Sequence, residues 1–489
     1  MMRLLVILVS ALLVAGCQAA ASPSPEPIQS SAAPASAGPV ATPDATDGPI
    51  ATSEGSPIAA GSRWEIAGTP LTSKLNSYDF RAIPIAGNRV LVLSHDTEEP
   101  YGPTAQIWDA ATNAWHETEP LPKSRQLSVA VPLADGRALV TGGVNDQEQS
   151  YSSTYIFDPA TETWSKSGLL GTARTNATAA VLKDGRVLVA GGHFRNGPTG
   201  ATEAPTVILA AFNPGLADID MPVFTAALAT AEIFDPATGT WSSTGPMIYA
   251  RNGAQAVTLN DGKVLIFGSE ASWNSGVAVD ERTFESAEIY DPATGTFTLA
   301  GSLPPIEREA LQASGPTGAN PIPLHRPDPG FGELVVVPDS RPFLIGLGQG
   351  WKHVGEITRS FWLEDDWVEM AGTYVAIGEP TPHMLYVPGV RDLSGSTASL
   401  LPDGRILIAG GYSSLEPFDD EGRTSYRHEH SDEALIFDPG GEWSIAPAMP
   451  VPRAGGTAVT LADGSVLVLG GNFEIGEGME GPPAVRFIP

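Results

Sequence analysis

The chain has one cysteine, few basic residues and only short apolar runs. Cys17 is the only thiol among 489 residues, which excludes an intramolecular disulfide and a cluster of thiolate metal ligands. Asp and Glu number 56 against 27 Lys and Arg, so the formal charge is −29. Because phosphate binding needs a clustered basic surface, this charge balance argues against nucleic acid and anionic headgroups as partners.

The cysteine ends an N-terminal segment that is typical of an export signal. Arg3 supplies a positive charge, residues 4–13 are apolar, and Val14-Ala15-Gly16-Cys17 follows. These four residues resemble the lipobox of bacterial lipoproteins, which implies that Cys17 is lipidated and becomes the mature N-terminus; an ordinary signal peptide with an incidental cysteine is the alternative. Two acyl chains give stable anchoring, so we expect an exported protein held on the outer side of the cytoplasmic membrane or cell envelope.

Three regions differ in composition. We predict a signal peptide with its lipobox over residues 1–17, a disordered tether over 18–62 and one folded domain over 63–489. The tether is nearly all Ala, Ser, Pro, Gly and Thr, a composition that cannot bury a core and that keeps the chain extended.

The folded domain repeats a hairpin in which an Asp-Gly turn joins two apolar strands. The clearest copy spans residues 179–192, and a glycine pair ends its second strand. An Asp-Gly pair is typical of a two-residue hairpin turn of type I′, because that turn needs positive φ at both of its central positions. A run that is apolar throughout indicates a strand covered on both faces. Similar turns lie at Asp135-Gly136, Asp261-Gly262, Asp403-Gly404 and Asp463-Gly464.

A third strand with an aromatic-Asp ending and a fourth strand opened by an aromatic residue complete each unit. The third strands include Tyr155-Ile156-Phe157-Asp158 and Glu232-Ile233-Phe234-Asp235. The aromatic residues that open the fourth strands are Trp115, Trp164, Trp241, Phe297, Trp367 and Trp443. Six units are complete, and the least regular covers residues 348–375.

The seventh unit is divided between the two ends of the folded domain. Its first three strands lie within 457–487, and the missing fourth matches residues 63–71. Pairing the first strand with the last closes a ring and removes open sheet edges. We therefore predict an all-β, seven-bladed β-propeller. The double glycine, the aromatic-Asp strand and the following Trp resemble the kelch-repeat family over about 63–489.

Four arginines recur before the first strands, each eighteen residues before the second position of its glycine pair, which is Ser269 in one unit: Arg125, Arg174, Arg251 and Arg453. Arg391 occupies the comparable loop of another unit, and His193 opens a long insertion at about 193–229. Two further insertions cover about 301–332 and 413–431, and we expect all three on one face. A ring of guanidiniums at a channel mouth would bind carboxylates. Alternatively, the arginines pack between blades, as the kelch resemblance implies. We name these six residues as candidate ligand-binding residues.

The resemblance extends to the galactose oxidases, kelch relatives that use copper. Their Tyr-His pair would fall at Ser394 and Gly395, counted back from the hairpin turn Asp403-Gly404. The only cysteine lies in the lipobox, so the cross-linked Cys-Tyr cofactor has no counterpart. We therefore predict no metal and no cofactor, with catalytic residues unknown.

We predict a monomeric binding module for a carbohydrate or protein partner, without nucleic acid and with membrane contact only through lipidated Cys17. The alternative is a carbohydrate-active enzyme of the epimerase or lyase type that uses arginines and carboxylates in the channel.

Overall fold

The Asp-Gly turns and apolar strands build four-stranded antiparallel sheets. The computed structural model describes residues 61–71, 80–96, 102–147, 149–195, 225–269, 277–278, 286–302, 333–336, 342–348, 357–363, 367–374, 395–420, 423–438, 442–471 and 483–489. The predicted signal peptide, Cys17 and nearly all of the predicted tether lie outside these residues. No helix that is long and apolar enough to cross a membrane occurs in the part of the chain that is described.

Six sheets, which we call blades, are described with side chains on most of their strands. We number the sheets along the chain. Blade 1 contains β2 (Arg81–Ile85), β3 (Arg89–Asp96), β4 (Gly102–Asp109) and β5 (Ala114–Glu117); blade 2 contains β6 (Val129–Pro132), β7 (Ala138–Thr141), β8 (Ser153–Asp158) and β9 (Thr163–Leu169). Blade 3 contains β10 (Thr178–Val181), β11 (Val187–Ala190), β13 (Ala231–Asp235) and β14 (Thr240–Ser243); blade 4 contains β15 (Gln255–Thr258), β16 (Val264–Phe267), β18 (Ser286–Asp291) and β19 (Thr296–Ser302). Blade 6 contains β24 (Ser396–Leu400), β25 (Ile406–Gly410), β28 (Ala434–Asp438) and β29 (Glu442–Ile445); blade 7 contains β30 (Thr457–Thr460), β31 (Val466–Leu469), β32 (Val485–Ile488) and β1 (Arg63–Ile66).

A further four-stranded sheet, sheet 5, is described by its backbone alone. It contains β20 (Glu333–Val336), β21 (Pro342–Gly348), β22 (Ile357–Leu363) and β23 (Trp367–Tyr374). The described chain therefore shows six blades in full where seven were predicted. The difference falls in the unit whose repeat signals are weakest, next to the Pro-rich insertion at 301–332.

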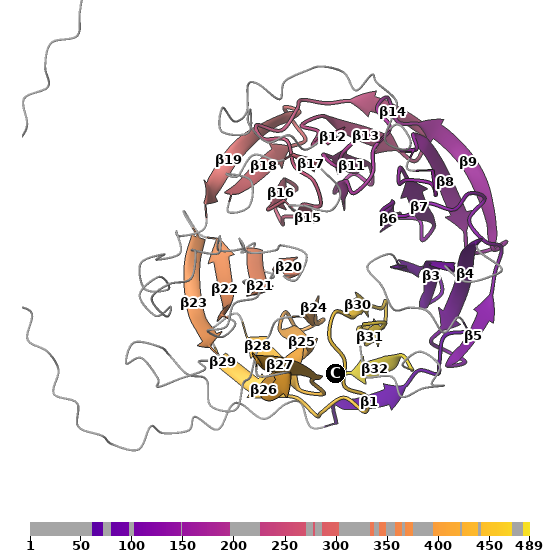
Figure 1. Cartoon of the computed structure of the whole chain (residues 1–489). Coiled ribbons are helices and arrows are strands. Elements are labelled where there is room, and N and C mark those ends of the chain that lie inside the picture. The colour runs from indigo at the N-terminus through magenta and orange to yellow at the C-terminus, as the bar shows by residue number, and fades with distance from the viewer. Residues whose placement is uncertain are drawn as a thin grey trace, which may run out of the picture. The chain divides into compact units, whose positions relative to one another are not determined.

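The innermost strands follow one another around a propeller. Each first strand contacts the first strand of the next sheet, in the order β2, β6, β10, β15, β20, β24, β30 and again β2. Figure 1 shows β6, β15, β20, β24 and β30 near the centre, with β5, β9, β14 and β19 on the outside. The β-propeller predicted from the repeats is confirmed.

The N-terminal strand completes the last blade, as predicted. β1 pairs antiparallel with β32, and Trp64 lies opposite Phe487 in the register. Because β1 is the outermost strand of blade 7, the two ends of the domain are hydrogen-bonded to each other, and the blade needs both ends of the domain to form.

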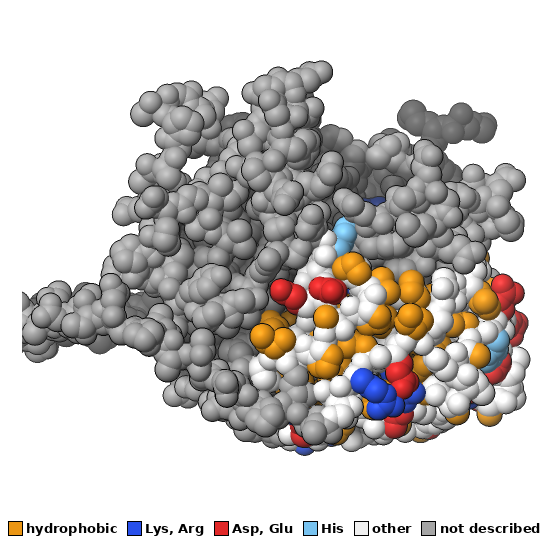
Figure 2. Space-filling view, turned by 90° about the horizontal axis from the view of Figure 1, so that it is seen from below, with side chains coloured by type: hydrophobic (Ala, Val, Ile, Leu, Met, Phe, Trp, Pro, Cys, Tyr) orange, Lys and Arg blue, Asp and Glu red, His pale blue; other side chains and the backbone are white. Residues whose placement is uncertain are grey.

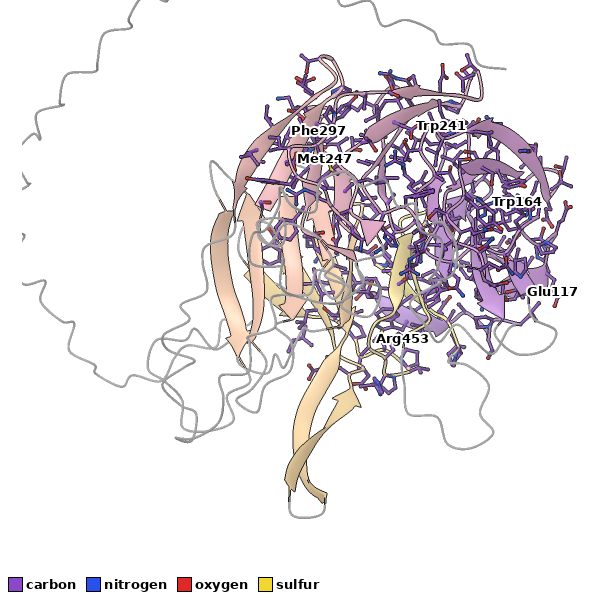
Figure 3. All side chains as sticks on the ribbon, turned by 45° about the horizontal axis from the view of Figure 1, so that its top comes forward. Glu117, Trp164, Trp241, Met247, Phe297 and Arg453 are labelled. Atoms are coloured by element: carbon purple, nitrogen blue, oxygen red, sulfur yellow. The ribbon has the colours of Figure 1, made fainter. Side chains whose placement is uncertain are left out.

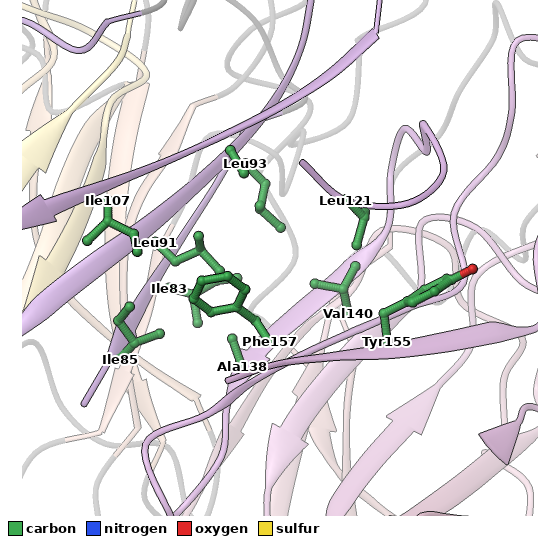
Figure 4. Close-up of a cluster of buried hydrophobic side chains, with 11 residues drawn as sticks. Ile83, Ile85, Leu91, Leu93, Ile107, Leu121, Ala138, Val140, Tyr155 and Phe157 are labelled. Atoms are coloured by element: carbon green, nitrogen blue, oxygen red, sulfur yellow. The ribbon is translucent and has the colours of Figure 1, made fainter. Parts of the chain in front are cut away.

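The core lies between adjacent blades. The second strands β7, β11, β16 and β31 are buried at every residue, as their apolar sequences predict. Between blades 1 and 2, Ile83 and Leu91 pack in one cluster with Val140 and Phe157, and Figure 4 shows these side chains converging. Blades are thus held to one another mainly by apolar burial.

The fourth-strand tryptophans add a polar bond between blades. The ring of Trp164 packs against Phe157 of its own blade at 5.0 Å between centroids. Its indole Nε1 donates to the carbonyl of Glu119, which follows blade 1, at 2.8 Å. Trp241 packs on Phe234 in the same way. The side chain of Trp443 lies outside the described residues.

Candidate functional site

The recurring arginines bind the backbone of their own blades. Each guanidinium donates from Nη1 to the carbonyl of the first glycine of its pair, seventeen residues ahead: Arg125 to Gly142, Arg174 to Gly191, Arg251 to Gly268 and Arg453 to Gly470. The same guanidiniums reach groups at or just before the start of the third strand, such as Ser153 for Arg125. Each arginine side chain therefore joins the loop before the first strand to the end of the second strand and to the start of the third strand.

The backbone carbonyls of Arg174, Arg251 and Arg453 accept hydrogen bonds from the preceding blade. Gly143 of blade 2 donates to the carbonyl of Arg174 at 2.9 Å, and Gly192 of blade 3 donates to that of Arg251 at 2.8 Å. The first glycine of each pair lies against the same carbonyl: a Cβ on Gly142 would lie 2.5 Å from Arg174 O. The glycine pair and the arginine thus recur together because they meet across each blade junction.

In blades 3 and 4 a buried glutamate accepts the guanidinium. Glu232, the first residue of the Glu-Ile-Phe-Asp strand, receives Arg174 Nη2 at 2.8 Å. It also receives the backbone N–H groups of Gly171 and Thr172, at 2.6 and 3.1 Å. Both carboxylate oxygens therefore accept hydrogen bonds within the protein, which indicates a structural role for Glu232.

Blade 4 repeats this geometry closely. Glu288 accepts from Arg251 Nε at 3.0 Å, and from the backbone N–H groups of Ile248 and Tyr249 at 2.6 and 3.1 Å. Both side chains of the ion pair are completely buried.

Blade 2 has no such carboxylate. Tyr155 stands where Glu232 stands in blade 3, and the Arg125 guanidinium lies 5.0 Å from its ring centroid and 4.7 Å from that of Tyr151. Burial lowers the pKa of Arg125 to about 10, so the group stays charged at neutral pH. Within the described residues neither Arg125 nor the neighbouring Lys123 forms an ion pair. The two tyrosine rings take the place of the anion.

In blades 2 and 7, which lack the carboxylate, a proline stands in the loop before the arginine. The residue three before the arginine donates its N–H to the glutamate in blades 3 and 4, whereas it is Pro122 in blade 2 and Pro450 in blade 7. A proline has no N–H to donate. In blade 7 the strand residue is Val485, and Arg453 binds only backbone carbonyls among the described residues, including Pro483 O at 2.7 Å.

These positions favour the packing interpretation of the arginines. Arg125, Arg174, Arg251 and Arg453 are between 0% and 6% exposed. The proposed ring of free guanidiniums at a channel mouth is therefore not what their side chains form, because blade formation already uses them. Arg391, the fifth predicted arginine, lies outside the described residues.

His193 is also buried, at 1% exposed, and joins two blades. Its Nδ1 lies 2.6 Å from Asn252 Oδ1 of blade 4, and its Nε2 accepts from Arg195 Nε at 3.0 Å. Burial, with a smaller contribution from the charge of Arg195, lowers the pKa of His193 to about 4. The imidazole is therefore neutral at physiological pH and serves as a bridge between blades rather than as an exposed ligand group.

Two of the three insertions extend from the ends of second strands. Within the long insertion of blade 3, β12 (Thr225–Ala226) pairs in parallel with β17 (Val277–Ala278) of the corresponding segment in blade 4. In blade 6 the insertion forms a hairpin of β26 (Tyr412–Asp420) and β27 (Arg423–His430). Figure 3, in which Arg453 is labelled, shows this hairpin in light orange projecting away from the sheets. The third predicted insertion, 301–332, falls almost wholly outside the described residues.

A small hollow lies at the Asp-Gly end of blades 3 and 4. It measures about 250 Å³ and is lined by residues that include Lys183, Asp184, Asp261 and Lys263. Asp184 accepts from Arg186 Nε at 2.8 Å, and that hydrogen bond holds the pKa of Asp184 below its usual value. An ionised, already bonded carboxylate is not poised for proton transfer.

Several outer strands expose an apolar side chain. Ile66 of β1, Leu169 of β9, Leu299 of β19 and Ile445 of β29 are each more than half exposed. Figure 2 shows one face on which hydrophobic side chains gather, interrupted by a few charged groups.

The strand glutamates Glu232 and Glu288 were not among the predicted site residues. Their signal was present in the sequence, because Glu replaces Tyr, Leu or Val at the first position of a strand whose other residues recur. No group of three or more potential metal-binding His, Cys, Asp or Glu side chains occurs among the described residues.

Comparisons with known proteins agree with this architecture. The Kelch motif matches residues 128–167, which span β6 to β9 except for the last residues of β9. No curated protein matches the sequence. Among solved structures, a fungal alcohol oxidase of the AA5 family, determined in complex with copper, is similar with a TM-score of 0.51 and 16% identity, over 87% of this chain and 76% of that one.

The similarity to the oxidase concerns the fold. Gly395, one of the two positions at which counting back from the hairpin turn places the Tyr-His pair of the galactose oxidases, has no side chain, and its φ is +69°. The other, Ser394, lies outside the described residues. Gly395 therefore cannot supply a side-chain ligand to a copper centre of that type. The chain is thus a β-propeller that carries a Kelch motif in its second blade.

Proposed function

We propose that this chain is an exported, lipid-anchored β-propeller that acts as a binding module for a protein or carbohydrate partner at the cell envelope. The observation that supports binding over catalysis is the use of the recurring polar groups. The guanidiniums and the buried glutamates of blades 3 and 4 are bonded to one another and to backbone within the blade. No carboxylate faces them across an open pocket in the described chain.

Other features favour the same proposal. Kelch propellers commonly act in protein interaction, and here the inserted segments depart from the repeat while the blades keep it. Loops are where a rigid scaffold most often carries its binding residues. We further propose that sheet 5 is the seventh blade, because β20 contacts both β15 and β24, and that the protein is a monomer.

Anchoring and binding are tested separately. Replacing Cys17 by Ser should release the exported protein from the membrane fraction into the soluble fraction, whereas a membrane-bound Cys17→Ser protein would contradict the lipid anchor. For binding, the purified protein is applied to a glycan array and, in parallel, cross-linked to envelope proteins. Heat-denatured protein is the control. We expect selective binding by the folded protein alone, and equal signals from folded and denatured protein would refute the proposal.

A further inference from the structure

The loop before the first strand of blade 2 has a backbone donor without an acceptor. In blades 3 and 4 the residue two before the arginine donates its N–H to the buried glutamate; these residues are Thr172 and Tyr249, and both distances are 3.1 Å. The corresponding residue of blade 2 is Lys123, and the third strand there has Tyr155 in place of the glutamate. The Lys123 N–H has no acceptor among the described residues. This loop therefore keeps a donor that the related blades use for a carboxylate.

Two cations lie beside this donor. Lys123 Nζ lies 5.5 Å from the ring centroid of Tyr151, and Arg125 Cζ lies 4.7 Å from the same centroid. Neither cation forms an ion pair within the described chain, whereas the arginines of blades 3 and 4 bind Glu232 and Glu288. An aromatic ring attracts a cation more weakly than a carboxylate that accepts its N–H groups. Blade 2 thus has two adjacent positive charges that no described carboxylate neutralises.

The two cations differ in their access to solvent. Lys123 is exposed and Tyr151 is half-buried, whereas Arg125 is 6% exposed. Arg125 uses both of its Nη atoms to donate to Gly142 and Ser153. A carboxylate from another molecule would therefore contact Lys123 directly, and Arg125 would contribute its charge rather than a hydrogen bond.

Blade 7 shows that the missing glutamate alone does not create this arrangement. Arg453 also binds only backbone carbonyls among the described residues, but it is 1% exposed. The residue two before it is Val451, which has no ammonium group. The exposed Lys123 is thus the feature that distinguishes blade 2.

The charge of the whole chain limits the kind of partner. With a formal charge of −29, the protein repels strongly acidic molecules at long range. Salt screens exposed charges that lie more than about 8 Å apart, so local charges decide once two surfaces touch. A single carboxylate in an otherwise neutral or basic peptide segment meets both conditions. In blades 3 and 4 the corresponding N–H binds a glutamate side chain, which is the same chemical group.

We propose that Lys123, with Arg125 and Tyr151 beside it, is a binding site for a single aspartate or glutamate carboxylate of a partner protein. The N–H and the ammonium of Lys123 would donate to the carboxylate oxygens, and the positive charge of Arg125 would strengthen the contact. This inference rests on the proposed binding function and names the group that the partner contributes.

The test measures peptide binding to the purified full-length protein. The probes are an array of acetylated, amidated nonapeptides of neutral or basic composition, each with one central glutamate, and the same peptides with glutamine at that position. Lys123→Met removes the ammonium but keeps the backbone N–H. Its matched control is Lys166→Met, at an exposed lysine of β9 in the same blade. The thermal midpoint of each variant verifies that the propeller remains folded.

We expect the wild type and Lys166→Met to bind a subset of the glutamate peptides at least about fivefold more tightly than their glutamine counterparts, since hydrogen bonds to charged groups are the stronger ones. Lys123→Met should lose this preference. A water-soluble carbodiimide should couple the glutamate of a bound peptide to Lys123 and not to Lys166, as located by peptide mass spectrometry.

Equal binding of glutamate and glutamine peptides, or a preference that persists in Lys123→Met, would overturn the inference. Lys123-dependent binding of galacturonate oligosaccharides without peptide binding would also overturn it, because the site would then belong to a glycan. Selective protein or glycan binding that does not depend on Lys123 would overturn the inference and leave the broader binding function standing.

Discussion

Blades 2 and 4 each bury a recurring arginine, but they surround its guanidinium with different groups. Both bury an arginine that binds the carbonyl of the first glycine of the pair, but blade 4 adds Glu288 and two backbone donors, whereas blade 2 surrounds Arg125 with Tyr151 and Tyr155. Two residues differ: Tyr155 replaces the glutamate, and Pro122 lacks one of the two loop N–H groups that hold Glu288 in blade 4.

Blade 1 supports this interpretation with a neutral side chain. Gln106 stands at the position of Glu288, and its Oε1 accepts the N–H of Leu71 at 2.8 Å. Leu71 corresponds to Ile248 of blade 4. In both blades, therefore, the third strand has a hydrogen-bond acceptor where the loop residue has a free N–H to donate. The repeat consensus thus defines the path of the backbone, whereas the charge of the third-strand residue differs from blade to blade.

The largest expected effect separates the two types of blade. Arg251→Met leaves Glu288 buried without its cation, which should cost about 3–5 kcal/mol of unfolding free energy. Arg125→Met removes hydrogen bonds to carbonyls but also removes a buried charge without an anion, so we expect about 1–2 kcal/mol. Urea denaturation of both variants measures the difference, and equal losses would remove the distinction.

The tryptophans should show no such distinction, because both types of blade use them alike. Trp164→Ala in blade 2 and Trp241→Ala in blade 3 should each cost about 3 kcal/mol, at the lower end for a truncated aromatic since both rings are half-buried. Thermal unfolding of the two variants gives the values. A wild-type midpoint in either would contradict the repeat register.

Acid should weaken the junction of blades 3 and 4 through His193. Its folded-state pKa of about 4 lies below the ordinary value of 6.5, so the unfolded chain takes up the proton first. The stability is fully present above about pH 6.5 and is lost as the pH falls toward 4, by about 2 kcal/mol at pH 5.

The control for this pH effect is His193→Gln, which cannot titrate. At the junction of blades 2 and 3 the corresponding residue is Val144, so no similar loss arises there. The unfolding free energies of wild type and variant should therefore differ less at pH 5 than at pH 7.5. The same difference at both pH values would show that His193 does not titrate as described.

The smallest effect concerns conversion of one blade type into the other. Tyr155→Glu places a carboxylate near Arg125 but without the N–H that Pro122 lacks. Adding Pro122→Ala should restore that donor and recover about 1 kcal/mol relative to Tyr155→Glu alone. The midpoint of urea unfolding measures the recovery. If Pro122→Ala has the same effect with Tyr155 in place, the loop donor does not control the carboxylate.

Much of the fold was predictable because its signals are local. Asp-Gly turns, apolar second strands and glycine pairs identified the blades, and the match of residues 63–71 to a fourth strand identified the closure by β1. The third and fourth strands of sheet 5 were harder, because their aromatic and turn signals are the least regular.

The role of the arginines could not be predicted from their spacing. A regular series of Arg125, Arg174 and Arg251 fits a ligand ring and a structural series equally well. Burial also depends on the preceding blade, whose glycine pair contacts the backbone carbonyl of the arginine and lies far earlier in the chain. The sequence did contain a signal for the two types of blade. Glu stands in place of Tyr155 on the third strands of blades 3 and 4, and Pro122 lies in the loop of blade 2.

The most direct test of this account is a pair of double-mutant cycles on unfolding free energy. One combines Arg251→Met with Glu288→Leu in blade 4, and the other combines Arg125→Met with Tyr155→Leu in blade 2. We predict a coupling energy of about 2–3 kcal/mol in blade 4 and below about 1 kcal/mol in blade 2. Equal coupling energies in the two blades would contradict it.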